Sequence, residues 1–159
     1  GVAGDAALLS RFEAVRAETL ARPRDPAKVV EEVVAMRRRM RAELDRTDGA
    51  LFDLKQGEGG LVDLEFLLQA LVLMHAGDCV ELNLPRDTVG LIAAAEACGR
   101  LEPAEAAGLQ DAHGTLLTLG LECTLDRRPR RVPFSDSLEA ARAAVRAVTQ
   151  ARGFAFDAG

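Results

Sequence analysis

The feature that most constrains this chain is a glycine-rich loop that runs directly into its most apolar segment. Residues 52–69 read Phe-Asp-Leu-Lys-Gln-Gly-Glu-Gly-Gly-Leu-Val-Asp-Leu-Glu-Phe-Leu-Leu-Gln. Glycine tolerates positive φ and close backbone approach, and Gly60 is an acceptable N-cap for a helix that begins at Leu61. The predicted helix runs to about His75 and is apolar nearly all round, so other helices must surround it.

The few polar residues of this central helix are not scattered. Asp63 falls at the third helical position, where a carboxylate accepts free backbone N–H groups and meets the positive end of the helix dipole. Glu65 and Gln69 lie one turn apart on the same face, while Asp63 points elsewhere. These two residues either hydrogen-bond within a bundle or face a partner.

Composition favours a helical domain with an aliphatic core. The chain has 159 residues, no tryptophan or tyrosine and six phenylalanines, and is rich in Ala, Leu, Arg and Glu. A net charge of −5 argues against a general nucleic-acid binder. The apolar run at 61–74 carries charges and is shorter than the ~18 residues of a membrane span, so we expect no membrane insertion. No signal peptide opens the chain, and we expect a cytoplasmic protein.

The cysteines and histidines give little sign of a metal or nucleophilic site. Cys79, Cys98 and Cys123 cannot all pair and have no close spacing, which favours reduced thiols. His75 and Cys79 are four residues apart with a glycine between them, so we expect no metal site. Neither histidine has a recognisable Ser or Cys partner for nucleophilic catalysis.

Periodicity and capping residues predict helices at 5–20, 26–44, 61–75, 87–98, 103–125 and 136–153, with an irregular connection between 77 and 85. Glycines inside the fifth helix are expected where another helix backbone comes close; they are Gly108, Gly114 and Gly120. The basic segment 127–131 reads as a solvated loop.

The second predicted helix carries an arginine-rich stretch beside its apolar stripe. That stripe is expected to consist of Val29, Val33, Met36, Met40 and Leu44. Arg37 and Arg41 are stacked one turn apart on another face. Arginines near a helix C-terminus suit the dipole and hydrate easily, which favours a solvated face. The alternative is that one or two of them reach the carboxylates of the central loop, a neighbouring domain or a partner.

The motif Asp53-Leu-Lys-x-x-x-Gly59-Gly60-x-x-Asp63-x-Glu65-Phe66-x-x-Gln69 closely resembles one in the helical domains of bifunctional glutamine synthetase adenylyltransferase/adenylyl-removing enzymes. In that family the half that removes AMP tends to read Arg-Glu-Ile-Glu-Phe after the two glycines. The half that attaches AMP reads nearer to Asp-Ile-Glu-Phe, and residues 62–66 are similar to this second form. The resemblance is specific from about residue 33 to residue 75.

The resemblance implies an all-α bundle of about six helices around a central apolar helix. Residues 1–159 would form a single helical domain cut from a larger enzyme, consistent with a chain that starts at Gly1 without methionine. The family transfers AMP from ATP to a tyrosine of glutamine synthetase, removes it by phosphorolysis in its other half, and responds to glutamine and a PII-type signal protein. ATP and Mg²⁺ would belong to a nucleotidyltransferase domain.

The residues here do not suffice for that chemistry. The Gly-Ser turn, strand and Asp-x-Asp carboxylates of nucleotidyltransferases do not appear in this sequence. On a helix the side chains of Asp63 and Glu65 diverge by about 200° and cannot share a metal in the same way. Anion binding by the glycine loop is disfavoured by Glu58 and Asp63, and no Gly-Lys-Ser/Thr follows. We therefore expect a fragment that is inactive alone.

Our hypothesis is that the central motif faces the absent catalytic domain and helps to position it. The candidate residues are Lys55, Gly59, Gly60, Asp63, Glu65 and Gln69. Lys55 would meet a phosphate or pair with Asp63. One alternative is a non-catalytic helical module that binds a regulatory protein through its arginines, with Arg37 and Arg41 as candidates. A second is the helical domain of the deadenylylating half or of a single-function homologue.

Overall fold

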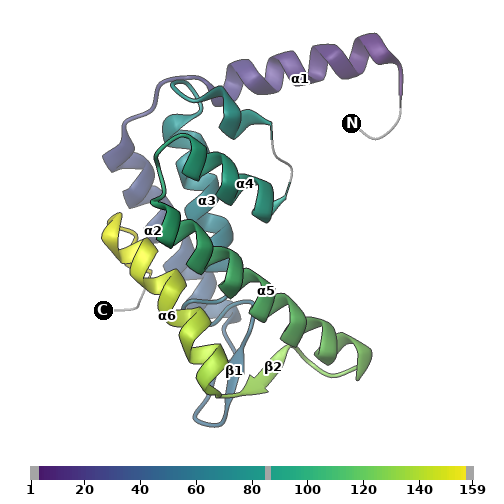
Figure 1. Cartoon of the computed structure of the whole chain (residues 1–159), viewed down its shortest axis with the longest axis vertical. Helices are drawn as coiled ribbons and strands as arrows, with labels where there is room; N and C mark the ends of the chain where they lie inside the picture. The colour runs from purple at the N-terminus through teal and green to yellow at the C-terminus, as the bar shows by residue number, and fades with distance from the viewer. Residues whose placement is uncertain (1–3, 85–86, 157–159) are drawn as a thin grey trace.

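The computed structural model describes residues 4–84 and 87–156, which form six α-helices and one small sheet (Figure 1). The helices are α1 (Ala6–Leu20), α2 (Pro26–Leu44), α3 (Leu61–His75), α4 (Thr88–Ala97), α5 (Pro103–Leu125) and α6 (Asp136–Ala151). The predicted mostly helical bundle is confirmed. A short 3₁₀ helix, η1 (Val80–Asn83), lies in the connection expected to be irregular. Pro85, the predicted end of that connection, lies outside the described residues.

The helices begin where capping side chains dictate. Free N–H groups at a helix start need acceptors, and a short polar side chain just before the helix supplies one. The side chains of Asp5, Asp25, Asp87 and Ser135 accept backbone N–H groups at the starts of α1, α2, α4 and α6. At α5, Glu102 and Glu105 form a reciprocal capping box.

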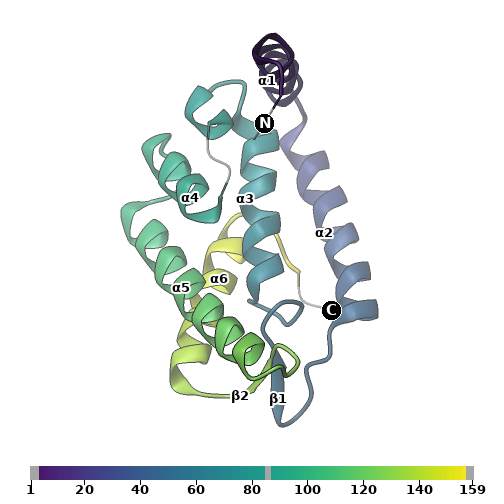
Figure 2. The same ribbon diagram turned by 90° about the vertical axis from the view of Figure 1, so that its right-hand side faces the viewer.

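Helix α3 is the central element of the bundle. Figure 2 shows it with α2 on one side and α4 and α5 on the other. Its leucines at 64, 67, 68 and 71 are buried in an aliphatic core. The prediction that the apolar helix would be surrounded is therefore confirmed, and the polar side chains of α3 must each find a partner or a route to solvent.

Two three-residue strands were not predicted. β1 (Leu51–Asp53) pairs antiparallel with β2 (Arg131–Pro133), with Phe52 opposite Val132. Runs of three residues are too short to show alternation against the background of the sequence. The pairing brings the segment before the glycine-rich loop next to the segment that leads into α6.

Helix α1 is the least integrated element. None of its residues is buried, and Figure 1 shows it lying across one end of the molecule and extending past the other helices. Leu8, Phe12 and Val15 are all more than half exposed. Among the described residues, no helix combines the length and apolar character that crossing a bilayer requires.

Of the three glycines of α5, one lies against another helix. A Cβ at Gly114 would meet nothing within 4 Å. At Gly108 it would meet only the side chain of Ala144 at 3.8 Å, and at Gly120 only that of Arg130 at 4.0 Å. The expectation of a neighbouring helix is therefore wrong for Gly114 and Gly120, whereas Gly108 lies against the small residue Ala144 of α6.

Two of the three cysteines are paired. Cys79 and Cys98 form a disulfide across a Cα–Cα distance of 6.2 Å, and Cys123 is free and buried. The prediction of reduced thiols is therefore wrong for Cys79 and Cys98. The two are 19 residues apart and meet because the chain folds back from η1 through α4.

Candidate functional site

The glycine-rich loop is a tight turn organised by Asp53. The Asp53 carboxylate accepts the backbone N–H groups of Lys55 at 3.0 Å and Gln56 at 2.9 Å, and the Asp53 carbonyl accepts that of Gly57 at 2.9 Å. A Cβ at Gly57 would lie 2.6 Å from that same carbonyl oxygen. A side chain at position 57 would therefore force the turn or the Phe52 ring to move.

The turn caps α3 with its own backbone. The N–H of Leu61 donates to the carbonyl of Leu54 at 3.0 Å, and that of Val62 donates to the carbonyl of Lys55 at 3.1 Å. These are donors that a phosphate at a helix N-terminus would use. Their engagement gives a physical reason, beyond the acidic residues nearby, why the loop does not suit a phosphate.

Asp63 lies at the centre of a buried ionic cluster. Its Oδ1 accepts Nε of Arg37 at 2.6 Å, and its Oδ2 accepts Nη2 of Arg41 at 2.6 Å and the N–H of Gly59 at 2.7 Å. Arg37 also donates to the carbonyl of Gln56 at 2.7 Å. We call Arg37, Arg41, Gln56, Gly59 and Asp63 the Asp63 cluster. It joins α2, the turn and α3.

This cluster changes the interpretation of three predicted residues. Asp63 is 2% exposed and Arg37 is fully buried, so Asp63 does not face outward, and its oxygens are occupied by α2. The interpretation that arginines reach a carboxylate of the central motif is confirmed for Arg37 and Arg41. The solvated-face interpretation is wrong for these two residues and fits Arg38 and Arg39, which are exposed.

Helix α6 covers the outer side of the turn. Gly59 has φ +77°, and a Cβ there would lie 2.7 Å from the carbonyl oxygen of Arg142. The Arg142 guanidinium donates from Nε to the carbonyl of Glu58 at 3.0 Å and stacks over the ring of Phe52 at 4.3 Å. Gly59 and Gly60 are buried, so both serve the domain's own packing.

The remaining candidates are exposed. Lys55, Glu65 and Gln69 all lie at the surface. The predicted pair between Lys55 and Asp63 does not form, because both carboxylate oxygens of Asp63 are bound by arginines. Gln69 lines a groove with Arg16 of α1 and Leu91 of α4. The structure thus separates the predicted set into a buried group and an exposed group.

Glu65 lies within electrostatic range of His113 on α5. Burial lowers the pKa of His113 below its usual 6.5, and the charges of Glu65 and Asp87 oppose that shift. Beyond His113, Leu117 and Leu121 follow at one-turn intervals, about half exposed, and line a groove with Leu61 at the start of α3. We call Glu65, Gln69, His113, Leu117 and Leu121 the α3 face. It combines exposed apolar area with a few polar groups, as interaction surfaces do.

Comparison with known proteins decides the family. Residues 31–155 match the family model described as GlnD PII-uridylyltransferase. The chain belongs to this family. The matched range contains the whole Asp63 cluster and the whole α3 face.

Within this GlnD PII-uridylyltransferase family, the chain is similar to bifunctional glutamine synthetase adenylyltransferase/adenylyl-removing enzymes. The relative from Stenotrophomonas maltophilia (strain K279a) is 53% identical over 156 residues, 98% of this chain and 17% of that protein. The relative from Xanthomonas campestris pv. campestris (strain B100) is 51% identical over 158 residues, 99% and 17% respectively. The relative from Nitrosococcus oceani is 44% identical over 112 residues, which are 70% of this chain and 12% of that protein. The resemblance drawn from the motif is confirmed, and the chain spans about one sixth of its first relatives.

Sequence reasoning missed two residues that hold the glycine-rich turn of this chain. The carbonyl of Gln56 accepts a hydrogen bond from Arg37, and the backbone of Arg142 on α6 packs against Gly59. Gln56 carried a weak signal, since it is a polar residue inside the glycine-rich loop. Arg142 carried none, because nothing in a chain with 20 basic residues distinguishes it.

Proposed function

We propose that the chain is the helical domain that follows the adenylylating nucleotidyltransferase domain of a bifunctional enzyme. That enzyme transfers AMP from ATP to a tyrosine of glutamine synthetase, and its other half removes the AMP by phosphorolysis. Identity of 53% with a relative of that name supports the proposal, as does the form of residues 62–66. ATP and Mg²⁺ bind in the nucleotidyltransferase domain, a PII-type protein regulates the enzyme, and the setting is the cytoplasm.

The role we assign to this chain is scaffolding and interdomain contact, without catalysis of its own. Both oxygens of Asp63 accept hydrogen bonds from groups inside the domain, and the residue is 2% exposed, so its carboxylate does not face a substrate. The Asp63 cluster instead fixes the turn between α2 and α3. Glu65 and Gln69, which follow on α3, are then presented in one fixed position.

The observation that carries this role is the composition of the α3 face. α3 is an apolar helix at the centre of the bundle, yet Glu65 and Gln69 are exposed. Glu65 lies within electrostatic range of His113 of α5. The exposed Leu117 and Leu121 of α5 line a groove with Leu61 of α3. Exposed leucines in a soluble domain lose the free energy that burial would provide. A neighbouring domain that covers the α3 face would gain that energy and hydrogen-bond Glu65 and Gln69.

A second candidate is a helical module that binds a regulatory protein. The arginines proposed for that role do not support it, because Arg37 and Arg41 are engaged inside the domain. The exposed stripe of Leu8, Phe12 and Val15 on α1 does support it, since no other described element buries it.

The rate at which the parent enzyme adenylylates glutamine synthetase distinguishes the interdomain role from the regulatory module. We expect the pair Glu65→Ala and Gln69→Ala to slow AMP transfer to glutamine synthetase about 10-fold, the effect of losing roughly 1.4 kcal/mol at an interface. The melting temperature of the isolated chain should not change. Glu32→Ala, an exposed carboxylate on α2, is the matched control.

Unchanged AMP transfer by the double variant would refute the interdomain role of the α3 face. In that case, loss of the response to a PII-type protein on Phe12→Ala would favour the regulatory module instead. Loss of AMP transfer together with a lower melting temperature would mean that Glu65 and Gln69 act in folding, which would also refute the proposal.

A further inference from the structure

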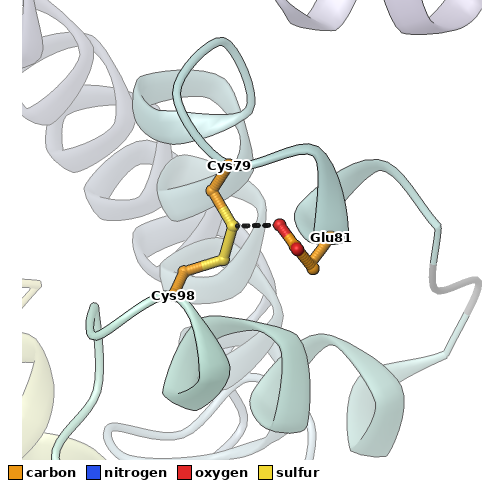
Figure 3. Close-up of side chains that lie close together, drawn as sticks. All are labelled: Cys79, Glu81 and Cys98. Carbon is orange, nitrogen blue, oxygen red and sulfur yellow. Dashed lines mark hydrogen bonds between the residues drawn. A yellow bond between two sulfur atoms is a disulfide. The ribbon is translucent and has the colours of Figure 1, made fainter.

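Cys79, Glu81 and Cys98 form a compact group of metal-ligating side chains (Figure 3). Cys79 follows α3 and begins η1, Glu81 lies in η1, and Cys98 ends α4. The ligand atoms of all three lie within 4.8 Å of one another. Over residues 4–84 and 87–156, this is the single group of three or more such residues.

The position of Glu81 is not explained by the disulfide. Its Oε2 lies 3.1 Å from Sγ of Cys79, and Figure 3 shows the carboxylate directed at that sulfur. A disulfide sulfur has no proton to donate, and the exposed side chain of Glu81 could hydrate fully by turning to water. A carboxylate beside sulfur is favoured when the sulfur is a thiol, or when a cation binds both.

We propose that the reduced form of this chain binds a thiophilic divalent cation through Cys79, Cys98 and Glu81, and that Zn²⁺ is the ion that fits. Two thiolates and one carboxylate oxygen are all ordinary zinc ligands, and water completes a tetrahedron. Harder ions such as Mg²⁺ and Ca²⁺ prefer all-oxygen sites. This site lies apart from the α3 face and does not depend on the proposed function.

A dithiol or phosphine reductant first cleaves the Cys79–Cys98 disulfide, and its two electrons together with two protons give two thiols. The binding step is then an exchange of Zn²⁺ for these two protons. Each thiol loses its proton to solvent and forms a sulfur–zinc bond, Glu81 binds as the carboxylate, and no electrons are transferred. The ligand set then carries three negative charges against two positive ones. A carboxylate next to two thiolates is repelled without a cation, and the ion removes that repulsion.

The ion would connect the same two elements as the disulfide. Either link joins the start of η1 to the end of α4, across 19 residues of chain. Cys79 is buried and Cys98 half-buried, while Glu81 is exposed, so solvent reaches the site from the carboxylate side. Three protein ligands leave one position for water, as in sites where zinc remains accessible.

The test is a zinc titration of the reduced chain. The protein is reduced with tris(2-carboxyethyl)phosphine, freed of reductant under nitrogen, and titrated with Zn²⁺ against a chromophoric chelator. We expect one Zn²⁺ per chain, release of two protons, and a higher melting temperature, because the ion binds only the folded state. Co²⁺ in place of Zn²⁺ should give a thiolate charge-transfer band.

Matched variants locate the ligands. Cys79→Ser and Cys98→Ser should abolish the zinc-dependent rise in melting temperature, whereas Cys123→Ser should retain it. Glu81→Gln should weaken binding about 10-fold or more, the scale on which even outer-shell partners act. Asp78→Asn, a neighbouring exposed carboxylate, should have no effect.

Failure of the reduced wild-type chain to take up one Zn²⁺ would overturn the proposal, as would equal affinity in Cys98→Ser. Uptake without a thiolate band in the Co²⁺ form would also overturn it, since the ion would then lie elsewhere. The wild-type stoichiometry and spectrum do not depend on whether the serine variants fold.

Discussion

Arg37 of α2 donates from Nε to Oδ1 of Asp63 of α3 at 2.6 Å, and the two side chains are 0% and 3% exposed. The same guanidinium donates to the carbonyl of Gln56, so one residue of α2 fixes both the turn and the helix that follows it. Moving two charges out of water costs free energy that the pairing offsets only while both partners are present. The central motif is therefore sensitive to loss of either residue.

Replacing Asp63 with alanine should be strongly destabilising. The substitution leaves Arg37 buried without its counter-ion and deprives Arg41 and Gly59 of an acceptor. We expect the free energy of unfolding to fall by about 3–5 kcal/mol, measured by urea denaturation. Glu32→Ala, in an exposed pair with Lys28, should cost less than about 1 kcal/mol. Similar losses in the two variants would show that the Asp63 cluster contributes little.

Gly59→Ala should cost more than Gly99→Ala, although both glycines have positive φ. At Gly99, with φ +65°, a Cβ would meet nothing within 4 Å, so only backbone strain of about 1–2 kcal/mol is expected. At Gly59 the Cβ would also lie 2.7 Å from the carbonyl oxygen of Arg142. Overpacking adds about 1–3 kcal/mol. Equal urea midpoints for the two variants would mean that α6 moves away without cost.

The helices could be predicted closely because their boundaries are set by local chemistry. Asp25 followed by Pro26 specifies the start of α2, and Asp87 specifies the start of α4, whatever the rest of the chain does. The end of α4 was predicted by Gly99, whose φ is +65°. The strands, by contrast, depend on pairing between residues about 80 positions apart, for which a single sequence carries no local signal.

The buried arginine could not be predicted, because the hydrophobic pattern of α2 points elsewhere. The apolar stripe was expected to continue from Val33 to Met36 and Leu44, but both of these are 45% exposed. The buried face of α2 instead runs through Val29, Val33 and Arg37. Its direction is decided by Asp63 on the neighbouring helix, which makes an arginine acceptable where a methionine was expected.

The Glu65 carboxylate should keep the pKa of His113 higher than burial alone would make it. Burial lowers that pKa from 6.5 because it disfavours the imidazolium, and the carboxylates of Glu65 and Asp87 oppose the change. Glu65→Gln removes one opposing charge, so the pKa of His113 should fall further in an NMR titration. His75 is an internal control, since burial and Arg100 lower its pKa while Asp78 opposes them. A parallel change at His75 would mean that the substitution alters the fold.

The ion pair between Glu105 and Arg152 should make stability depend on pH in acid. Arg152 donates Nη1 to Oε1 at 2.9 Å and Nη2 to Oε2 at 2.6 Å, a two-point contact that joins α5 to the end of α6. Hydrogen bonds from Arg152 lower the pKa of Glu105 below its usual 4.5, and the backbone N–H of Glu102 adds to the effect.

Because the folded protein lowers this pKa, the carboxylate contributes stability that is fully present above pH 4.5 and is lost as the pH falls through the folded value. Glu105→Gln should therefore lower the free energy of unfolding by about 0.5–1 kcal/mol at neutral pH. The difference from wild type should shrink as the pH falls from about 5 to about 3, followed by urea denaturation. In an Arg152→Leu background, the same substitution should have little effect at any pH. A difference that stays constant across this range would exclude the carboxylate charge as its source.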